Sequence, residues 1–486
     1  GNISVSNALI GGTLSVVGAT HLKNTVSVGD AAKFASTVTI TGATGFLSTV
    51  RVSGAATMAS TLDVAGNTSV GGTLFVTGAG TFDNNGSVSG NLVVGGTTTV
   101  IGAMSVGGAL SVGGATNLLS TVTVAGATGF LGSVRVSGAT SVSNANVGGT
   151  LTVAGAVSLA STLSVGGAAN FASTVTVAGV GIFKDAVSVS GNLDVAGNVS
   201  VGGTIFATGG ITFDGDISVS GDVNIGGTLT VGGATSLAST LSVGGATNLL
   251  DTVTVAGATG FLSTVRVSGA ATMASTLDVA GNTSVGGTLF VTGAGTFDNN
   301  GSVSGNLVVG GTTTVIGAMS VGGALSVGGA TNLLSTVTVA GATGFLGSVR
   351  VSGATSVSNA NVGGTLTVAG AVSLASTLSV GGAANFASTV TVAGVGIFKD
   401  AVSVSGNLDV AGNVSVGGTI FATGGITFDG DISVSGDVNI GGTLTVGGAT
   451  SLASTLSVGG ATNLLSTVTV AGATGFLSTV RVSGAA

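Results

Sequence analysis

Three aspartates that lie close together in the sequence are the strongest candidates for chemistry in this chain. Asp214, Asp216 and Asp222 fall within the segment FDGDISVSGD, which recurs 215 positions later. Carboxylate oxygens at such spacing are ligands that Ca²⁺ accepts in proteins. Aspartate is also a common turn residue whose side chain bonds nearby backbone, and the nine-residue Gly/Asp motif of calcium-binding coils is absent. We therefore assign these residues to turns and expect no metal site, with calcium as the alternative.

A catalytic centre has less to build on. The chain has one histidine, His21, no cysteine, and neither a pair of facing carboxylates nor a Ser–His–Asp arrangement. We interpret His21 and Lys23 as surface neighbours. Glycine pairs such as Gly71-Gly72 and Gly107-Gly108 lack the strand–loop–helix context of a phosphate-binding loop, so they indicate corners. We expect no catalytic residue, no cofactor and no enzymatic activity.

The composition excludes several classes of protein. Hydrophobic residues make up 44% of the 486 residues and charged residues only 5%, which is the opposite of a disordered chain. Glycine is abundant, at 92 residues, but it follows no three-residue period and proline is absent, so collagen is excluded. The net charge of −7 disfavours nucleic acid and anionic lipid as partners. No apolar run is long enough for a membrane span.

The elements that must position any site follow a six-residue pattern, which begins at Asn7. The fourth position of each hexad is aliphatic, Met or Phe, and the second is apolar or small, as in Leu14 and Val16. Two apolar positions at i and i+2 predict a short strand with one face buried. Charged residues such as Arg51 and Asp63 fall between these positions or in the turns. Strands this short are stable only when stacked, so we expect an all-β fold, a parallel β-solenoid built from hexapeptide strands.

The number of hexads in each coil stays open at this stage. Between Leu14 and Gly80 the second position alternates between large and small residues with a twelve-residue period. This period favours a two-sided, 12-residue coil in which similar residues stack in columns. Three hexads would give an 18-residue coil with a triangular cross-section.

A much longer repeat covers most of the chain. Residues 43–257 recur at 258–472 with one difference, Asp251 against Ser466, and a third copy begins in 473–486. We expect residues 1–486 to form one continuous solenoid.

The hexad pattern has one recurrent fault. Val5 and Ile10 are five residues apart rather than six, and the same spacing recurs from Val142 to Val147 and 215 positions later. A corner with one residue deleted accounts for this spacing, and a bulge that sets the shape of a filament is the alternative. Thirty-five hexads and one such pentad make up the 215-residue repeat.

The outward positions carry mostly Thr, Ser, Ala, Gly and Asn, and we expect Phe75, Phe206 and Val93 to be exposed there. A soluble monomer normally has a surface with many more charged residues. This surface favours close contact between copies, so the chain itself is the expected partner. Threonine-rich flat faces are also typical of ice-binding solenoids, although no regular Thr-x-Thr ladder is sustained.

Three stretches carry a resemblance to a known class of proteins: GNLVVGGTTTV (90–100), GNLDVAGNVSVGGT (191–204) and GDISVSGDVNIGGTLTVGGAT (215–235). They resemble the repetitive shafts of tail-fibre and fibre-like proteins of bacteriophages and large algal viruses, and are similar to repeats of bacterial surface filaments. The resemblance implies a structural fibre at the virion surface or outside the cell. Such shafts are often homotrimers that share one core. The chain shows no tip domain, so the resemblance identifies no receptor-binding residue.

The hexad also resembles the left-handed β-helix repeat, whose enzymes are acyltransferases with a catalytic histidine. His21 falls at an outward position, and Ser236 takes its place at the equivalent position of the next repeat, so this resemblance implies no activity here. We expect a structural protein that assembles with itself into a rigid filament. A trimeric attachment-fibre shaft and an ice-binding solenoid are the alternatives.

Overall fold

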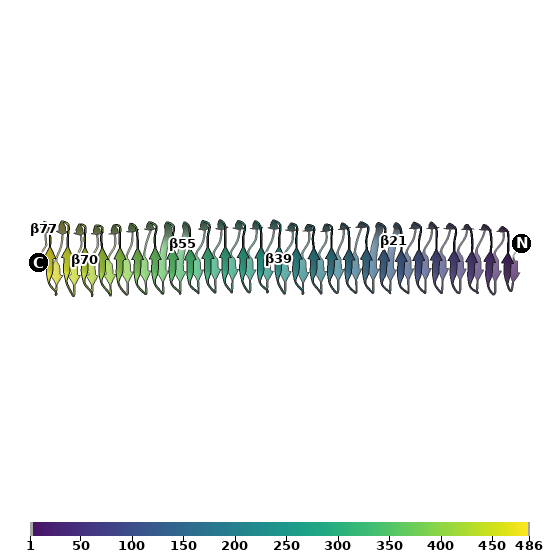
Figure 1. Cartoon of the computed structure of the whole chain (residues 1–486), viewed down its shortest axis with the longest axis horizontal. Helices are drawn as coiled ribbons and strands as arrows, with labels where there is room; N and C mark the ends of the chain where they lie inside the picture. Colours follow the sequence, from purple (N-terminus) through teal and green to yellow (C-terminus); the bar gives the residue numbers. More distant parts are fainter. Residues whose placement is uncertain (1–2, 485–486) are drawn as a thin grey trace. The chain divides into compact units, whose positions relative to one another are not determined.

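The strands form a parallel β-solenoid. The computed structural model describes residues 3–484, with side chains from residue 6 onwards, and its regular secondary structure is entirely β-strand. The chain divides into two units, Gly1–Gly245 and Ala246–Ala486, and within each unit the strands lie side by side in parallel (Figure 1). The expected all-β solenoid is confirmed. Its continuity over residues 1–486 stays a prediction, and residues 1, 2, 485 and 486 lie outside the described part.

Most strands have three residues, and they follow one another at intervals of six. Such strands run from β2 (Ala8–Ile10) to β20 (Thr116–Leu118), from β24 (Leu151–Val153) to β54 (Thr331–Leu333), and from β58 (Leu366–Val368) to β77 (Val480–Val482). The other strands are β1 (Ile3–Val5), β21 (Val122–Phe130), β22 (Val134–Val136), β23 (Thr140–Val147), β55 (Val337–Phe345), β56 (Val349–Val351) and β57 (Thr355–Val362).

Away from the ends of each unit, a strand pairs with the strand one turn earlier and the strand one turn later. In β10 (Ala56–Met58), for example, Ala56 lies opposite Val38 of β7 and Leu74 of β13. A turn therefore contains three strands and 18 residues, which is also the separation of residues that are hydrogen-bonded between turns at the corners. The 12-residue alternative is wrong. We name the three sides face 1 (β1, β4, β7 and onward), face 2 (β2, β5, β8) and face 3 (β3, β6, β9). In the second unit each residue takes the face number of its equivalent 215 positions earlier.

The core is the inside of each turn, where the second and fourth positions of the hexads meet. Val64 is fully buried, for instance, while Asp63 next to it is exposed. Among the side chains described from residue 6 onwards, threonine is the only polar residue type that is buried. The expectation that no charge occupies an inward position is confirmed, because an unpaired buried charge costs several kcal/mol.

Between Leu14 and Gly80, large and small residues at the second hexad position alternate along each face, whereas further on this order stops, as at Leu74, Leu92 and Leu110 on face 1. On face 3, Gly86 lies between Thr68 and Met104 on neighbouring turns. A Cβ on Gly86 would lie 2.7 Å from Cε of Met104, so the glycine makes room for that side chain. Because a turn holds three hexads, an odd number, the twelve-residue alternation of the sequence becomes an alternation from turn to turn. In that stretch the volumes of neighbouring turns compensate one another.

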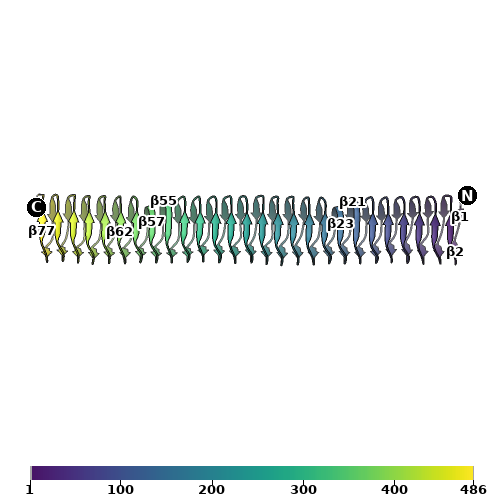
Figure 2. The same cartoon turned by 90° about the horizontal axis from the view of Figure 1, so that it is seen from above.

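The pentads from Val142 to Val147 and from Val357 to Val362 each remove one residue from the corner between face 3 and face 1, whereas the pentad from Val5 to Ile10 joins β1 on face 1 to β2 on face 2. Val122 of β21 lies opposite Thr140 of β23, one whole turn later, whereas Phe130 lies opposite Val147, one residue short of a whole turn. The same shift occurs between β55 and β57, and these four longer strands are labelled in Figure 2. The structure thus has one residue fewer at this corner, with a local shift in the register of the paired strands. Eleven turns of 18 residues and one of 17 residues make up the 215-residue repeat.

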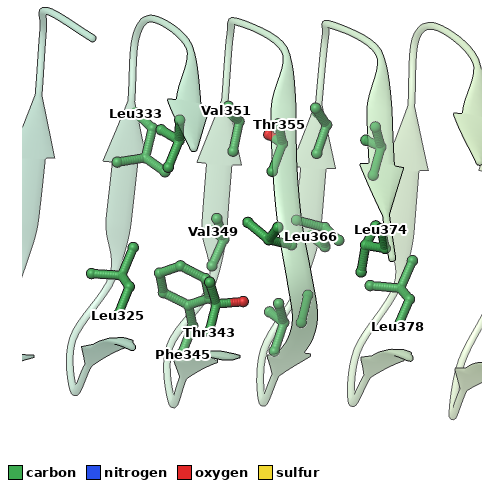
Figure 3. A pocket seen from close by; sticks show the side chains of 16 residues that line it. Leu325, Leu333, Thr343, Phe345, Val349, Val351, Thr355, Leu366, Leu374 and Leu378 are labelled. Carbon is green, nitrogen blue, oxygen red and sulfur yellow. The ribbon is translucent and has the colours of Figure 1, made fainter. Parts of the chain in front are cut away.

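A small cavity lies inside the solenoid at each of these shortened turns. In the second unit it has a volume of about 30 Å³, and Figure 3 shows Phe345, Thr343, Val349 and Leu366 around it. The first unit has an equivalent cavity of about 30 Å³ that includes Phe130. The lining is almost entirely apolar, and apolar cavities stay dry. The shortened turn is therefore less closely packed than its neighbours.

Two buried threonines occupy the same hexad position, and we expect their substitution by valine to have opposite effects on stability. The hydroxyl of Thr98 has no hydrogen-bond partner among the described residues, whereas that of Thr128 donates to the carbonyl oxygen of Asn144 at 2.8 Å. We expect T98V to stabilise its turn by about 1 kcal/mol and T128V to destabilise its turn by about 1 kcal/mol. Hydrogen exchange of the strand amides on either side measures both changes. Equal effects of the two substitutions would contradict the assignment.

Candidate functional site

The three aspartates of the sequence-based calcium hypothesis do not come together. Asp214 and Asp216 lie in the corner between β34 (Ile211–Phe213) on face 3 and β35 (Ile217–Val219) on face 1. Asp222 follows β35, in the corner between face 1 and face 2. The described residues contain no group of three or more Asp, Glu, His or Cys side chains that could hold a metal ion.

Asp216 instead takes part in a ladder of corner hydrogen bonds. Its amide donates to Oδ1 of Asn198 on the preceding turn at 2.9 Å, and its own Oδ1 accepts from the amide of Ala234 on the next turn at 2.8 Å. Asn91 binds the amide of Ala109 in the same way at 2.8 Å. Asn and Asp therefore connect consecutive turns where the backbone leaves the strands, as side chains that favour turns do.

Asp222 is the most strongly bonded carboxylate of this kind. Its Oδ1 accepts hydrogen bonds from Oγ of Ser239 at 2.5 Å, from Oγ1 of Thr240 at 2.6 Å and from the amide of Thr240 at 3.2 Å. The bond from Ser239, followed by those from Thr240, lowers the pKa of Asp222 below its ordinary value. Asp437 accepts the equivalent hydrogen bonds from Ser454 and Thr455, and they lower its pKa in the same direction.

This lowered pKa predicts a pH dependence. A carboxylate whose pKa is lowered by folding stabilises the folded state above its unfolded pKa, and this contribution is lost as the pH falls through the folded pKa. We expect the protection of the Thr240 amide against hydrogen exchange to fall across this acidic range. The double variant D222N/D437N changes both copies and removes the titration, so its protection should not follow the pH. A wild-type protection factor that stays constant into strong acid would contradict the prediction.

His21 and the glycine pairs carry no chemistry in this arrangement. His21 is exposed on face 1 and lies beside Thr39 of the next turn. Gly71 and Gly72 form part of the corner between face 3 and face 1, and the amide of Gly72 donates to the carbonyl oxygen of Gly54 at 3.1 Å. These glycines lie in a corner, as the sequence indicates.

The outward residues of face 2 form a polar groove that sequence reasoning missed. In the second unit the row contains Asn332, Arg350, Thr367 and Asn385 on consecutive turns. A hollow of about 420 Å³ lies on one side of Arg350, towards Thr312, and a hollow of about 250 Å³ lies on the other side. The second hollow extends along the row as far as Ser403 and its corner neighbour Ser405.

The first unit has the same groove around Arg135. A hollow of about 230 Å³ extends from Arg135 past Thr152 and Asn170 to Ser188. The sequence places Arg135 correctly at an outward position. The residues that lie beside Arg135 in space can be found in the sequence only by comparing the third positions of hexads one whole turn apart. This comparison requires the number of residues in a turn.

Exposed apolar side chains are scattered on the outward positions. Phe75 is 41% exposed and Phe206 is 51% exposed, as expected. Val93, which lies opposite Phe75 on the next turn, is half-buried, so that expectation was wrong.

Comparisons of the chain with protein-family models, with curated proteins and with solved structures find no match. The resemblance to fibre shafts therefore stays a prediction. Residues 3–484 contain no helix that is long and apolar enough to cross a membrane.

Proposed function

We propose that this chain is a structural protein that assembles with itself into a rigid filament, at the surface of a virion or outside a cell. The observation that carries the proposal is the parallel pairing of strands from turn to turn in each unit, where every turn except the shortened one adds the same kind of contacts as the one before. A fold of this kind has no built-in limit to its length. Because the 215-residue repeat contains a whole number of turns, a further copy adds only complete turns.

The composition of the core favours a filament whose chains each have their own interior. Inward residues such as Val28 and Val231 are fully buried by neighbouring turns of the same chain. In a trimeric shaft with one shared core, part of the surface of these side chains would be exposed in a single chain and covered by the two partner chains. The attachment-fibre alternative therefore receives less support. The ice-binding alternative also receives less support, because no face keeps Thr at both outward positions over successive turns. On face 2, for example, Thr97 and Thr99 are followed by Ala115 and Asn117.

Negative-stain electron microscopy together with sedimentation tests the proposal. We expect ordered filaments whose length increases with protein concentration. Monodisperse monomers over the same concentration range would contradict it.

Resistance to trypsin is a further expected property. Arg51 lies on β9 (Val50–Val52), which is paired on both sides, whereas Lys184 is exposed in the corner that follows β29 (Gly181–Phe183). We expect cleavage after Lys184 first, and cleavage after Arg51 at least about tenfold slower, because it requires local opening of paired strands. Mass spectrometry of the fragments over time measures the order. Early cleavage after Arg51 would contradict the prediction.

A further inference from the structure

The groove of face 2 has the features of a binding site for a chain-like ligand. We propose that it binds a linear acidic oligosaccharide, from Arg350 to Phe421 in the second unit and from Arg135 to Phe206 in the first. This activity is independent of filament formation, because it needs only one unit of one chain.

The length of the row suits an extended ligand. Arg350, Thr367, Asn385, Ser403 and Phe421 are consecutive outward residues of face 2, each opposite the next. Four turns separate the first from the last, which is about 19 Å at a spacing of about 4.8 Å between parallel strands. A linear oligosaccharide of four sugars has a similar length.

The side chains between the two ends suit sugar hydroxyls. Hydroxyl and amide groups such as those of Thr367, Asn385 and Ser403 both donate and accept hydrogen bonds, and so do the hydroxyls of a sugar. Along the adjoining corner the side chains are small, for example Ala369 and Ala387, and they leave the hollow of about 250 Å³ beside the row. A ligand in this hollow reaches the polar row without displacing any side chain of the core.

Phe421 supplies an apolar surface at one end. Its side chain is 51% exposed, between Ser403 on the preceding turn and Asn439 on the following one. An exposed aromatic ring among polar neighbours is not part of an apolar patch of the kind that marks a protein interface. The flat face of the ring is a surface on which the C–H groups of a pyranose ring pack.

The charges of the groove favour an acidic ligand. Over the five turns from Arg350 to Phe421, the charged residues on face 2 and its two corners are Arg350, Lys399 and Asp400. Oδ1 of Asp400 accepts a hydrogen bond from the amide of Ala401 at 2.8 Å. Arg350 is the one charged residue that lines the hollow of about 250 Å³, and Lys399 and Asp400 lie together in the opposite corner, between face 1 and face 2. A guanidinium group binds a carboxylate with two parallel hydrogen bonds, which makes the carboxylate of a sugar acid the best match for Arg350.

Two other classes of ligand fit less well. A nucleic acid needs a run of cations along its phosphates, and this groove has two. A peptide that adds a strand needs an unpaired strand edge, whereas β56 and β58 are paired on both sides.

Titration calorimetry on the full chain tests the proposal with three acidic tetrasaccharides, of galacturonate, mannuronate and guluronate, and with neutral cellotetraose. We expect at least one acidic tetrasaccharide to bind at two sites per chain, with an affinity that falls as salt is added. Cellotetraose should bind at least about tenfold more weakly, since it lacks the charge-assisted contact. No binding by any of the acidic tetrasaccharides, or equal binding by cellotetraose, would overturn the proposal.

Matched variants separate a built site from general attraction of charge. We expect R135Q/R350Q to weaken binding at least about tenfold, and F206S/F421S to weaken it several-fold. The control R51Q/R266Q removes two arginines from outward positions of face 3 and should leave the affinity unchanged. Equal losses in the two arginine pairs, or no loss in the phenylalanine pair, would overturn the proposal. All these positions point outward, and circular dichroism of each variant checks that the fold is retained.

Discussion

V106D should destabilise its turn by about 3–5 kcal/mol, because it places an unpaired carboxylate in the closed interior. Val106 is 1% exposed and lies in β18 (Met104–Val106), which pairs with β15 (Gly86–Val88) and β21. The turns on both sides share its side-chain contacts, so the damage should extend to them. Hydrogen exchange of the amides in these three strands measures the loss.

The neighbouring residue provides the control. Ser105 is exposed on the same strand, between Ser87 and Thr123 of the adjoining turns. S105D introduces the same carboxylate one residue away, on the outside, where it remains in water and meets no like charge in its row. We expect its effect to stay within about 0.5 kcal/mol, as for most surface substitutions. Similar losses in the two variants would show that the interior is not closed.

G66A should destabilise the corner between face 2 and face 3 by about 1–3 kcal/mol, the range for forcing extra atoms into a packed site. A Cβ on Gly66 would overlap the carbonyl carbon of Ser48 and lie 2.5 Å from the amide nitrogen of Thr49. The described residues include no glycine with a positive φ, so close approach and not backbone conformation excludes the side chain. Along this corner Gly66 lies between Ser48 and Asn84, so its turn lacks a side chain where both neighbouring turns have one.

Gly45 serves as the matched position for this prediction. It lies at the outward position of β8 (Thr44–Phe46), and a Cβ there would meet no atom within 4 Å. G45A should therefore be neutral or slightly stabilising, because alanine loses less conformational freedom than glycine on folding. Chemical denaturation followed by hydrogen exchange compares the two variants. Equal stability of G66A and G45A would contradict the importance of close approach at the corner.

The inward and outward positions of this fold could be predicted from the sequence because the residue types within each single hexad distinguish them. Val64 and Asp63 occupy neighbouring positions with opposite chemistry, and the same contrast recurs along the whole chain. The cost of burying a charge acts on single residues, so it leaves a local pattern that needs no knowledge of distant contacts.

The length of the turn could not be predicted in this way. The twelve-residue alternation that begins at Leu14 is compatible with two turn lengths. In a 12-residue turn with two sides, large residues would stack on large ones, and in an 18-residue turn with three sides, large residues stack on small ones. Corner geometry decides between them, and the small corner residues appear in both cases. The groove of face 2 depends on this turn length. Arg350 and Phe421 are far apart in the sequence, and only turns of three hexads, one of them shortened by a residue, bring them into one row.

The pairing of each strand with the next turn has a mechanical consequence. The hydrogen bonds between turns point along the stacking direction, so tension along that direction would open them one turn at a time and not all at once. A released full turn has a contour length of about 60 Å and replaces a rise of about 4.8 Å. Each unit would extend in uniform small steps. The shortened turn would be the one irregular step, because its longer strands pair in a shifted register next to the cavity.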